Sequence, residues 1–280
     1  MSRPSATAAL VVRGIAFQAR HPRHGHLVPP AAAELSQRFV RAAGLGVRRG
    51  DSLLDRMLVA IQERLFVPGL TLQYVMRKRR IEQIVREELA RGTAQLVVLG
   101  AGFDTLALRL SEEVPRLRAI EVDRGETQAG KRAAAGTGRR VVFVAAELGS
   151  ESLREKLEEC GAFDGNAPAI FLAEAVFLYL TPAHIHHTLA EIRAVSPPAT
   201  VVFTFFEERR LQANFRNATL LADLWLMWKR EPGRWAIDPA EIGRFAGEDG
   251  FRLVRLIRDH EYHEGLPAAR GEHIAVVEAG

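Results

Sequence analysis

The order of secondary-structure signals after residue 92 constrains the fold most strongly. Short apolar runs recur there, and stretches with helical spacing or helix-capping residues separate them. The predicted strands are 95–99, 117–122, 141–145, 169–173 and 200–206. The helices between them are expected at 103–110, 124–135, 150–159 and 182–194. Because parallel strands need crossover connections, this alternation predicts a parallel sheet with helices on both faces.

The end of the chain departs from this alternation. A helix is expected at 239–247, and the strands predicted at 251–257 and 273–278 are joined by a loop without a helix. Such a connection favours a final antiparallel pair at the sheet edge. The sequence therefore predicts a Rossmann-like α/β fold with seven mostly parallel strands and an antiparallel last strand, whereas NAD-binding folds usually have six parallel strands.

Two further regions flank this pattern. Residues 1–92 are predicted to form an N-terminal helical cap, because 53–66 and 74–89 have apolar residues at helical spacing. Residues 93–280 form the predicted main domain. Residues 207–237 interrupt the alternation after the fifth strand and contain all three tryptophans. We expect a helical insertion there, which is either a lid that faces a substrate or part of the core.

Composition narrows the class of protein. A single cysteine, Cys160, allows neither an internal disulfide nor a cysteine metal cluster. No apolar run is long enough for a membrane span, and the apolar stretch 8–12 is too short for a signal peptide, so a cytoplasmic protein without membrane association is expected. His184, His186 and His187 indicate a solvated helix face, and no metal site is predicted.

The net charge is +4, and the basic residues are scattered apart from one cluster at 77–80. Basic residues do not interleave with aromatic ones, so nucleic-acid binding is not expected. A basic balance can also attract an acidic small molecule.

The turn after the first strand carries the main chemical signal. Gly100, Ala101 and Gly102 follow the strand directly, and a glycine pair lets the backbone turn tightly and approach a ligand. Thr105 stands where a dinucleotide fingerprint requires its third glycine, which weakens the pyrophosphate interpretation. Asp123, preceded by Glu121, follows the second strand. A carboxylate there can accept both hydroxyls of a ribose, so the pair fits S-adenosylmethionine or NAD.

Three segments carry a resemblance to a known family. They are the runs 99–110, 121–123 and 173–180, with Arg77–Glu82 upstream and Glu231–Trp235 after the insertion. Over roughly residues 70–278 the chain resembles the leucine carboxyl methyltransferase family, and more narrowly its bacterial branch that methylates small molecules and peptides. The resemblance implies a fold of seven strands that binds S-adenosylmethionine.

The same resemblance implies residue roles in binding that cofactor. Arg77 would pair with the carboxylate of the methionine part, although any of the four basic residues at 77–80 can serve. Gly100, Ala101 and Gly102 would line the methionine end, and Glu174 would face its amino group. Asp123 would hold the ribose, and Glu121 before it is also expected to bind the cofactor. Glu147 and Leu148 would lie along the adenine, where the family usually has Asp at the position of Glu147.

Other residues are expected near the substrate. If the insertion is a lid, Trp228 and Trp235 contact the substrate together with Tyr179 from the run 173–180. Asp104 can cap the following helix as readily as it can bind a ligand.

Methyl transfer from a sulfonium needs alignment more than acid–base chemistry, and a carboxylate acceptor needs no general base. The expected function is therefore O-methylation of a carboxylate on a small molecule or peptide, with no catalytic side chain assigned. Methylation of a hydroxyl or nitrogen, which would need a base, and a catalytically silent binding protein are the alternatives. The sequence leaves the acceptor and the oligomeric state open.

Overall fold

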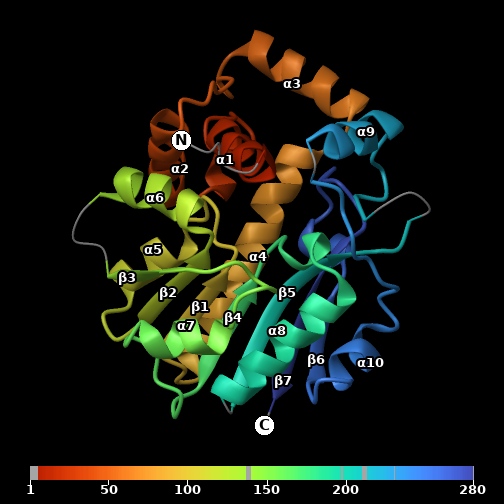
Figure 1. Ribbon diagram of the computed structural model, residues 1–280. Coiled ribbons are helices and arrows are strands. Elements are labelled where there is room, and N and C mark those ends of the chain that lie inside the picture. Colours follow the sequence, from red (N-terminus) through yellow and green to blue (C-terminus); the bar gives the residue numbers. More distant parts are fainter. Residues whose placement is uncertain (1–5, 137–139, 197, 210–212, 230, 280) are drawn as a thin grey trace.

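The computed structural model describes residues 6–136, 140–196, 198–209, 213–229 and 231–279. A twisted seven-stranded sheet forms its centre, with helices on both sides (Figure 1). The strands are β1 (Gln95–Leu99), β2 (Arg118–Asp123), β3 (Val141–Ala145), β4 (Ala169–Ala173), β5 (Ala199–Phe206), β6 (Arg252–Ile257) and β7 (Glu272–Ala279). Their order is β3-β2-β1-β4-β5-β7-β6. The first five pair in parallel, and β7 is antiparallel to both neighbours.

The α-helices surround this sheet. They are α1 (Ala6–Gln18), α2 (Pro30–Ala42), α3 (Leu53–Leu65), α4 (Leu70–Ala90), α5 (Leu106–Glu113), α6 (Gly125–Ala135), α7 (Leu153–Glu159), α8 (Pro182–Val195), α9 (Leu220–Trp228), α10 (Ile242–Gly247) and α11 (Asp259–Tyr262). No helix of the described residues is both long enough and apolar enough to cross a bilayer.

The predicted Rossmann-like fold with an antiparallel last strand is confirmed, and the differences are local. The helix expected at 103–110 begins only at Leu106, because residues 100–105 form the turn after β1. The helix expected at 150–159 begins at Leu153, and Ser152, not Ser150, caps it by accepting a hydrogen bond from the Glu155 amide. The connection between β6 and β7, predicted without a helix, contains the single turn of α11.

Two hydrophobic clusters cover the two faces of the sheet. In β1, Leu96 and Val98 face the cluster shared with α1, α2, α4 and α5, whereas Val97 and Leu99 face the one shared with α7, α8 and α10. This two-residue alternation between apolar partners explains why the strands read as continuous apolar runs. The N-terminal helices α1, α2 and α4 therefore complete the core of the main sheet.

Beneath the turn after β1 lies a fully buried ion pair. The Lys131 ammonium of α6 is 2.6 Å from the Glu121 carboxylate of β2, and both side chains are essentially inaccessible to solvent. Burial raises the pKa of Glu121 to about 7, and Lys131 limits that rise. A buried charge is tolerated only while its partner is present.

Replacing Lys131 with Met should lower the free energy of unfolding by about 3–5 kcal/mol at pH 8, because Glu121 is left as an unpaired buried carboxylate. The loss should shrink near pH 5. When the folded-state pKa of an acid lies above its unfolded-state pKa, the protein loses stability as the pH rises from the lower of these values to the higher. Urea unfolding at both pH values measures this. The double variant Glu121→Leu/Lys131→Met should recover most of the loss, and an equal loss at both pH values would contradict the explanation.

Candidate functional site

A cavity of about 840 Å³ opens where the strand order reverses, between β1 and β4. Residues after the carboxyl ends of β1, β2, β3 and β4 line it, together with residues of α1, α2 and α4. In sheets of this kind such a reversal separates the loops on either side and leaves room for a ligand. Figure 1 shows α1, α2 and α6 grouped above this edge of the sheet, with α4 running down from it.

The glycine turn forms one wall of the cavity. Gly100 and Gly102 have φ angles of +59° and +46°, in the left-handed region that side chains disfavour. A Cβ on Gly100 would lie 2.5 Å from Cγ2 of Val176, so there is no space for one. Gly100, Ala101 and Gly102 all line the cavity, as the sequence predicted for this turn.

Asp123 ties this turn to the end of β2. Its Oδ2 accepts a 2.6 Å hydrogen bond from the Gly102 amide, and its Oδ1 accepts one of 2.7 Å from the Arg124 amide. The carboxylate lines the cavity and is half-buried. Each oxygen keeps a further lone pair, so Asp123 can accept hydroxyl donors from a ligand while it holds the turn.

The loop after β3 supplies the next part of the wall. Glu147 is exposed and Leu148 is half-buried, and both line the cavity. The Glu147 amide donates to the Glu151 carboxylate. The Glu147 carboxylate itself has no hydrogen bond to another described residue. His184 of α8 lies beside this loop and also lines the cavity.

A buried ion-pair network forms the wall between β4 and α4. The Arg77 guanidinium is 2.8 Å from Glu174 at the end of β4 and 2.8 Å from Glu272 at the start of β7. Burial alone would lower the pKa of Arg77, but the carboxylates of Glu272 and Glu174 outweigh this effect and raise the pKa. Arg77 therefore stays charged in the site, with a fixed orientation.

Lys78 extends this network toward the glycine turn. Its ammonium is 2.9 Å from Glu174 and pairs with Asp104. Burial alone would raise the pKa of Asp104, but the charge of Lys78 lowers it. The other Asp104 oxygen accepts from the Leu106 amide, so this residue both caps α5 and lines the cavity.

The roof of the cavity joins distant parts of the chain. Glu231 accepts hydrogen bonds from the amides of Ala6 and Thr7 at 2.9 and 3.0 Å and from the Thr7 hydroxyl at 2.6 Å. The Tyr179 hydroxyl donates to the Thr7 hydroxyl oxygen at 3.0 Å. A carboxylate at the N-terminus of α1 satisfies otherwise unpaired amides and complements the helix dipole.

Two cations lie near the rim of this roof. Lys229 and Arg234 line the cavity, and both are exposed. No carboxylate of the described residues lies within ion-pair distance of either side chain. The rim can therefore attract an anionic ligand.

Three of the predicted site residues lie elsewhere. Glu121 is turned below the cavity, because it lies two residues inside β2, where Lys131 covers it. Trp235 is 4% exposed and packs against Phe177, Phe203 and Phe205 in the core. Trp228 is 73% exposed on α9 and does not line the cavity. These three side chains therefore do not line this cavity, whereas the other predicted site residues do, and their predicted contacts stay predictions.

Sequence reasoning missed several residues that the structure brings to the site. Lys78 was one of four neighbouring basic residues without a role of its own. Thr7 lies in a segment without any motif. Glu231 begins a run that carried a family resemblance, and that position was the available signal. The histidines of α8 have different surroundings, because His184 lines the cavity whereas His186 hydrogen-bonds to Asp249. The described residues include no cluster of side chains that could hold a metal ion.

The comparisons with known proteins agree with this geometry. The family model described as leucine carboxyl methyltransferase matches residues 9–193. A relative from Mycobacterium tuberculosis, named a candidate S-adenosyl-L-methionine-dependent methyltransferase, is 26% identical over 71% of this chain and 64% of its own length. A similarly named protein from Mycobacterium bovis is 29% identical over 94% of this chain and 89% of its own. The chain thus spans about 64% of the length of the first relatives it matches.

Solved structures share the fold. A candidate methyltransferase from Thermobifida fusca superposes with a TM-score of 0.62 at 17% identity, over 86% of this chain and 93% of its own. Human N-acetylserotonin methyltransferase, solved with S-adenosylmethionine, gives a TM-score of 0.50 at 15% identity, over 91% and 66% of the two chains. At these identities the likeness concerns the fold alone.

Glu231→Ala should loosen the roof without unfolding the protein. The change removes three hydrogen bonds from the first turn of α1, each of which a solvated amide or hydroxyl can replace with water. Amide hydrogen exchange should therefore rise about 5- to 30-fold in the first turns of α1, since a charged helix cap contributes about 1–2 kcal/mol. Glu241→Ala, which removes an exposed partner of Arg244, is the matched control. Unchanged exchange in α1 would show that Glu231 does not hold the roof.

Proposed function

The chain belongs to the leucine carboxyl methyltransferase family, and on this premise we propose that it transfers a methyl group from S-adenosylmethionine to a carboxylate of a small molecule or peptide. The observation that carries the proposal is the meeting of the glycine turn with Asp123 in a cavity at the strand reversal. That arrangement fits a nucleoside without a pyrophosphate.

The shape of the turn supports S-adenosylmethionine as the cofactor. The space that a Cβ on Gly100 would need is taken by Val176, so the bare backbone itself forms the wall that a ligand would touch. We assign the ribose hydroxyls to Asp123, the adenine to the loop at Glu147 and Leu148, and the methionine end to the turn at Gly100–Gly102. When bound, the cofactor supplies a methyl group on a positively charged sulfur, which needs no metal or oxidant.

The polar wall supports the same orientation. Arg77 can offer a remaining guanidinium donor to the carboxylate of the methionine part, and Lys78 adds a second cation. Glu174 can accept from the amino group, while its ion pairs with Arg77 and Lys78 hold its carboxylate in a fixed orientation. Among the four basic residues at 77–80, these contacts favour Arg77 and Lys78.

The chain's own residues would act by positioning and by excluding water. The roof made by α1, Tyr179 and Glu231 covers the cavity and limits solvent access above the reacting centre. Lys229 and Arg234 at the rim would attract an acidic acceptor and orient its carboxylate. Because a carboxylate is already an anion at neutral pH, no residue has to remove a proton from it.

One observation favours a second candidate, methylation of a hydroxyl or a nitrogen. His184 lines the cavity and can accept a proton in its neutral form. An acceptor with a bound proton would need such a base, whereas a carboxylate acceptor would not.

Asp123→Asn should weaken the binding of S-adenosylmethionine about 10- to 100-fold, because a charge-assisted hydrogen bond to the ribose contributes about 1.5–3 kcal/mol. Isothermal titration calorimetry measures the change. Glu126→Gln is the matched control, since Glu126 is an exposed acid on the first turn of α6 that does not line the cavity. Binding of NAD in preference to S-adenosylmethionine would refute the cofactor assignment.

Incubation with methyl-labelled S-adenosylmethionine and a panel of carboxylic acids should yield labelled methyl esters. Mild alkali should release the label as methanol, because esters hydrolyse under conditions that ethers and amines survive. His184→Gln should retain most of the activity if the acceptor is a carboxylate. An alkali-stable product that disappears in His184→Gln would instead support hydroxyl or nitrogen methylation, and binding of the cofactor without any transfer would indicate a silent binding protein.

A further inference from the structure

An apolar surface extends over two helices at one end of the molecule. Among the described residues, eleven large apolar side chains are exposed, and ten of them lie on α3 and α9. These ten, which we call the α3–α9 surface, are Leu53, Leu54, Met57, Ile61, Leu65, Leu220, Leu221, Leu224, Met227 and Trp228. The eleventh, Val254, is on β6.

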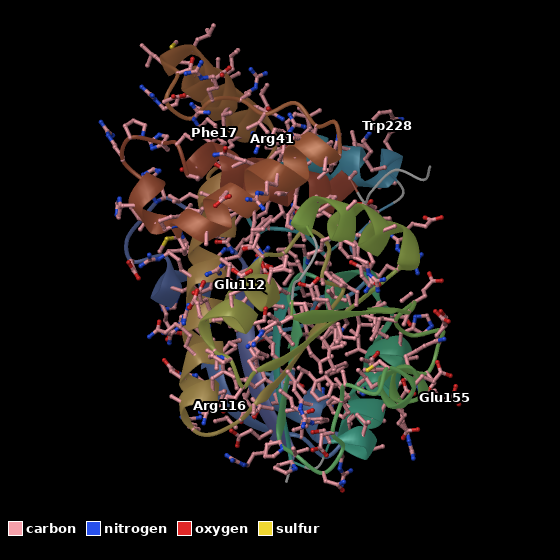
Figure 2. All side chains as sticks on the ribbon, turned by 90° about the vertical axis from the view of Figure 1, so that its left-hand side faces the viewer. Phe17, Arg41, Glu112, Arg116, Glu155 and Trp228 are labelled. Carbon is pink, nitrogen blue, oxygen red and sulfur yellow. The ribbon has the colours of Figure 1, made fainter. Side chains whose placement is uncertain are left out.

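The C-terminal end of α3 lies against the N-terminal end of α9, so the two exposed apolar faces are close to each other. The Thr219 hydroxyl donates to the Leu65 carbonyl at 2.6 Å, and the Thr219 amide donates to the Phe66 carbonyl at 2.8 Å. Figure 1 shows α3 and α9 near each other at the top of the molecule, and Figure 2 shows Trp228 at its outer edge. No residue of α3 is buried, so the core does not use the apolar stripe of this helix.

The extent of the surface is unusual for a protein that stays alone in water. Each of the ten side chains is 50–73% exposed. Together they present on the order of 1,000 Å², whereas the largest apolar patch on a typical monomer measures about 300–600 Å². A surface of this size marks contact with a protein, a ligand or a lipid phase.

The charges around the surface distinguish between these occupants. The acids of α3 and of the loop before it already have partners: Asp51 pairs with Arg20 and Arg49, and the Asp55 carboxylate accepts from the Arg49 amide. Glu63 accepts from Thr71.

Two cations at the border differ from these acids. Arg64 and Lys229 are exposed, and no carboxylate of the described residues lies within ion-pair distance of them. Arg64 and Lys229 are therefore available to an external anion, whereas the nearby acids are engaged within the chain.

Trp228 and Lys229 lie together at the end of α9. The Lys229 ammonium lies 4.0 Å from the centroid of the Trp228 ring. An amphipathic ring beside a lysine with a long apolar stem suits the boundary between headgroups and acyl chains. We propose that the α3–α9 surface docks the protein on a lipid bilayer that contains anionic headgroups.

A second copy of this chain fits the surface less well. In a twofold pair both copies bring the same surface to the interface, so Arg64 and Lys229 would meet a surface whose nearby acids are already engaged within their own chain. Anionic headgroups, in contrast, complement these cations.

The surface also adjoins the cavity, because Lys229 ends α9 and lines the cavity rim. Docking would therefore bring the cavity rim close to the bilayer. The proposal does not depend on the proposed methyl transfer, since docking requires neither the cofactor nor an acceptor.

The test is co-sedimentation of the full chain with vesicles of phosphatidylglycerol and phosphatidylcholine, compared with vesicles of phosphatidylcholine alone. We expect tighter binding to the anionic vesicles, and this preference should weaken as salt is added. Met57→Asp on α3 and Leu224→Asp on α9 should each weaken vesicle partitioning about tenfold or more, because an exposed apolar side chain that the bilayer would bury is replaced by a charge. Arg64→Gln should reduce only the preference for anionic lipid.

Val254→Asp is the matched control, because it places the same charge at an exposed apolar position outside the α3–α9 surface. Its partitioning should equal that of the unmodified protein. All variants alter exposed side chains, and circular dichroism with thermal melting verifies their folding. The proposal is overturned if the protein binds neither kind of vesicle. It is equally overturned if Met57→Asp, Leu224→Asp and Val254→Asp bind the vesicles with the same affinity. It is also overturned if analytical ultracentrifugation shows a dimer that Met57→Asp dissociates while vesicles bind nothing, since the occupant is then a second copy.

Discussion

The ion-pair network around Arg77 holds together the part of the structure that makes a site possible. Its guanidinium joins α4 to the end of β4 through Glu174 and to the start of β7 through Glu272. These partners lie 97 and 195 residues away along the chain. The network therefore fixes the N-terminal helices against the sheet at the strand reversal. Apolar packing alone is not directional and would not fix the orientation of these helices. Because Arg77 and Glu174 both line the cavity, this part of the cavity wall has a fixed geometry.

Much of the fold could be predicted because its signals are local. An apolar strand followed by a capped helix identifies a crossover unit without any knowledge of the rest of the chain, and β3 and β4 were predicted to the residue. The glycine turn and Asp123 were predicted for the same reason, since they follow directly from where β1 and β2 end. The family resemblance stated from these runs is likewise confirmed.

The parts that could not be predicted depend on contacts between distant segments. Glu121 and Asp123 look alike as acids near a strand end, and only the packing of Lys131 over the sheet separates a buried structural carboxylate from one at the cavity. Trp228 and Trp235 lie in one segment, yet one is exposed and the other is in the core, and the sequence between them has no periodicity from which this difference could be predicted. The role of Glu231 depends on a partner 225 residues away.

That separation between Ala6 and Glu231 affects how the protein acquires a closed site as it is synthesised. The helix α1 leaves the ribosome early, whereas the carboxylate that holds its first turn emerges only after all of β1 to β5. A nascent chain can thus assemble the glycine turn and Asp123 long before the cover over them is fastened. The cavity is therefore completed late in synthesis, because a chain stopped before residue 231 would lack both Glu231, which holds the cover, and Glu272, which orients Arg77.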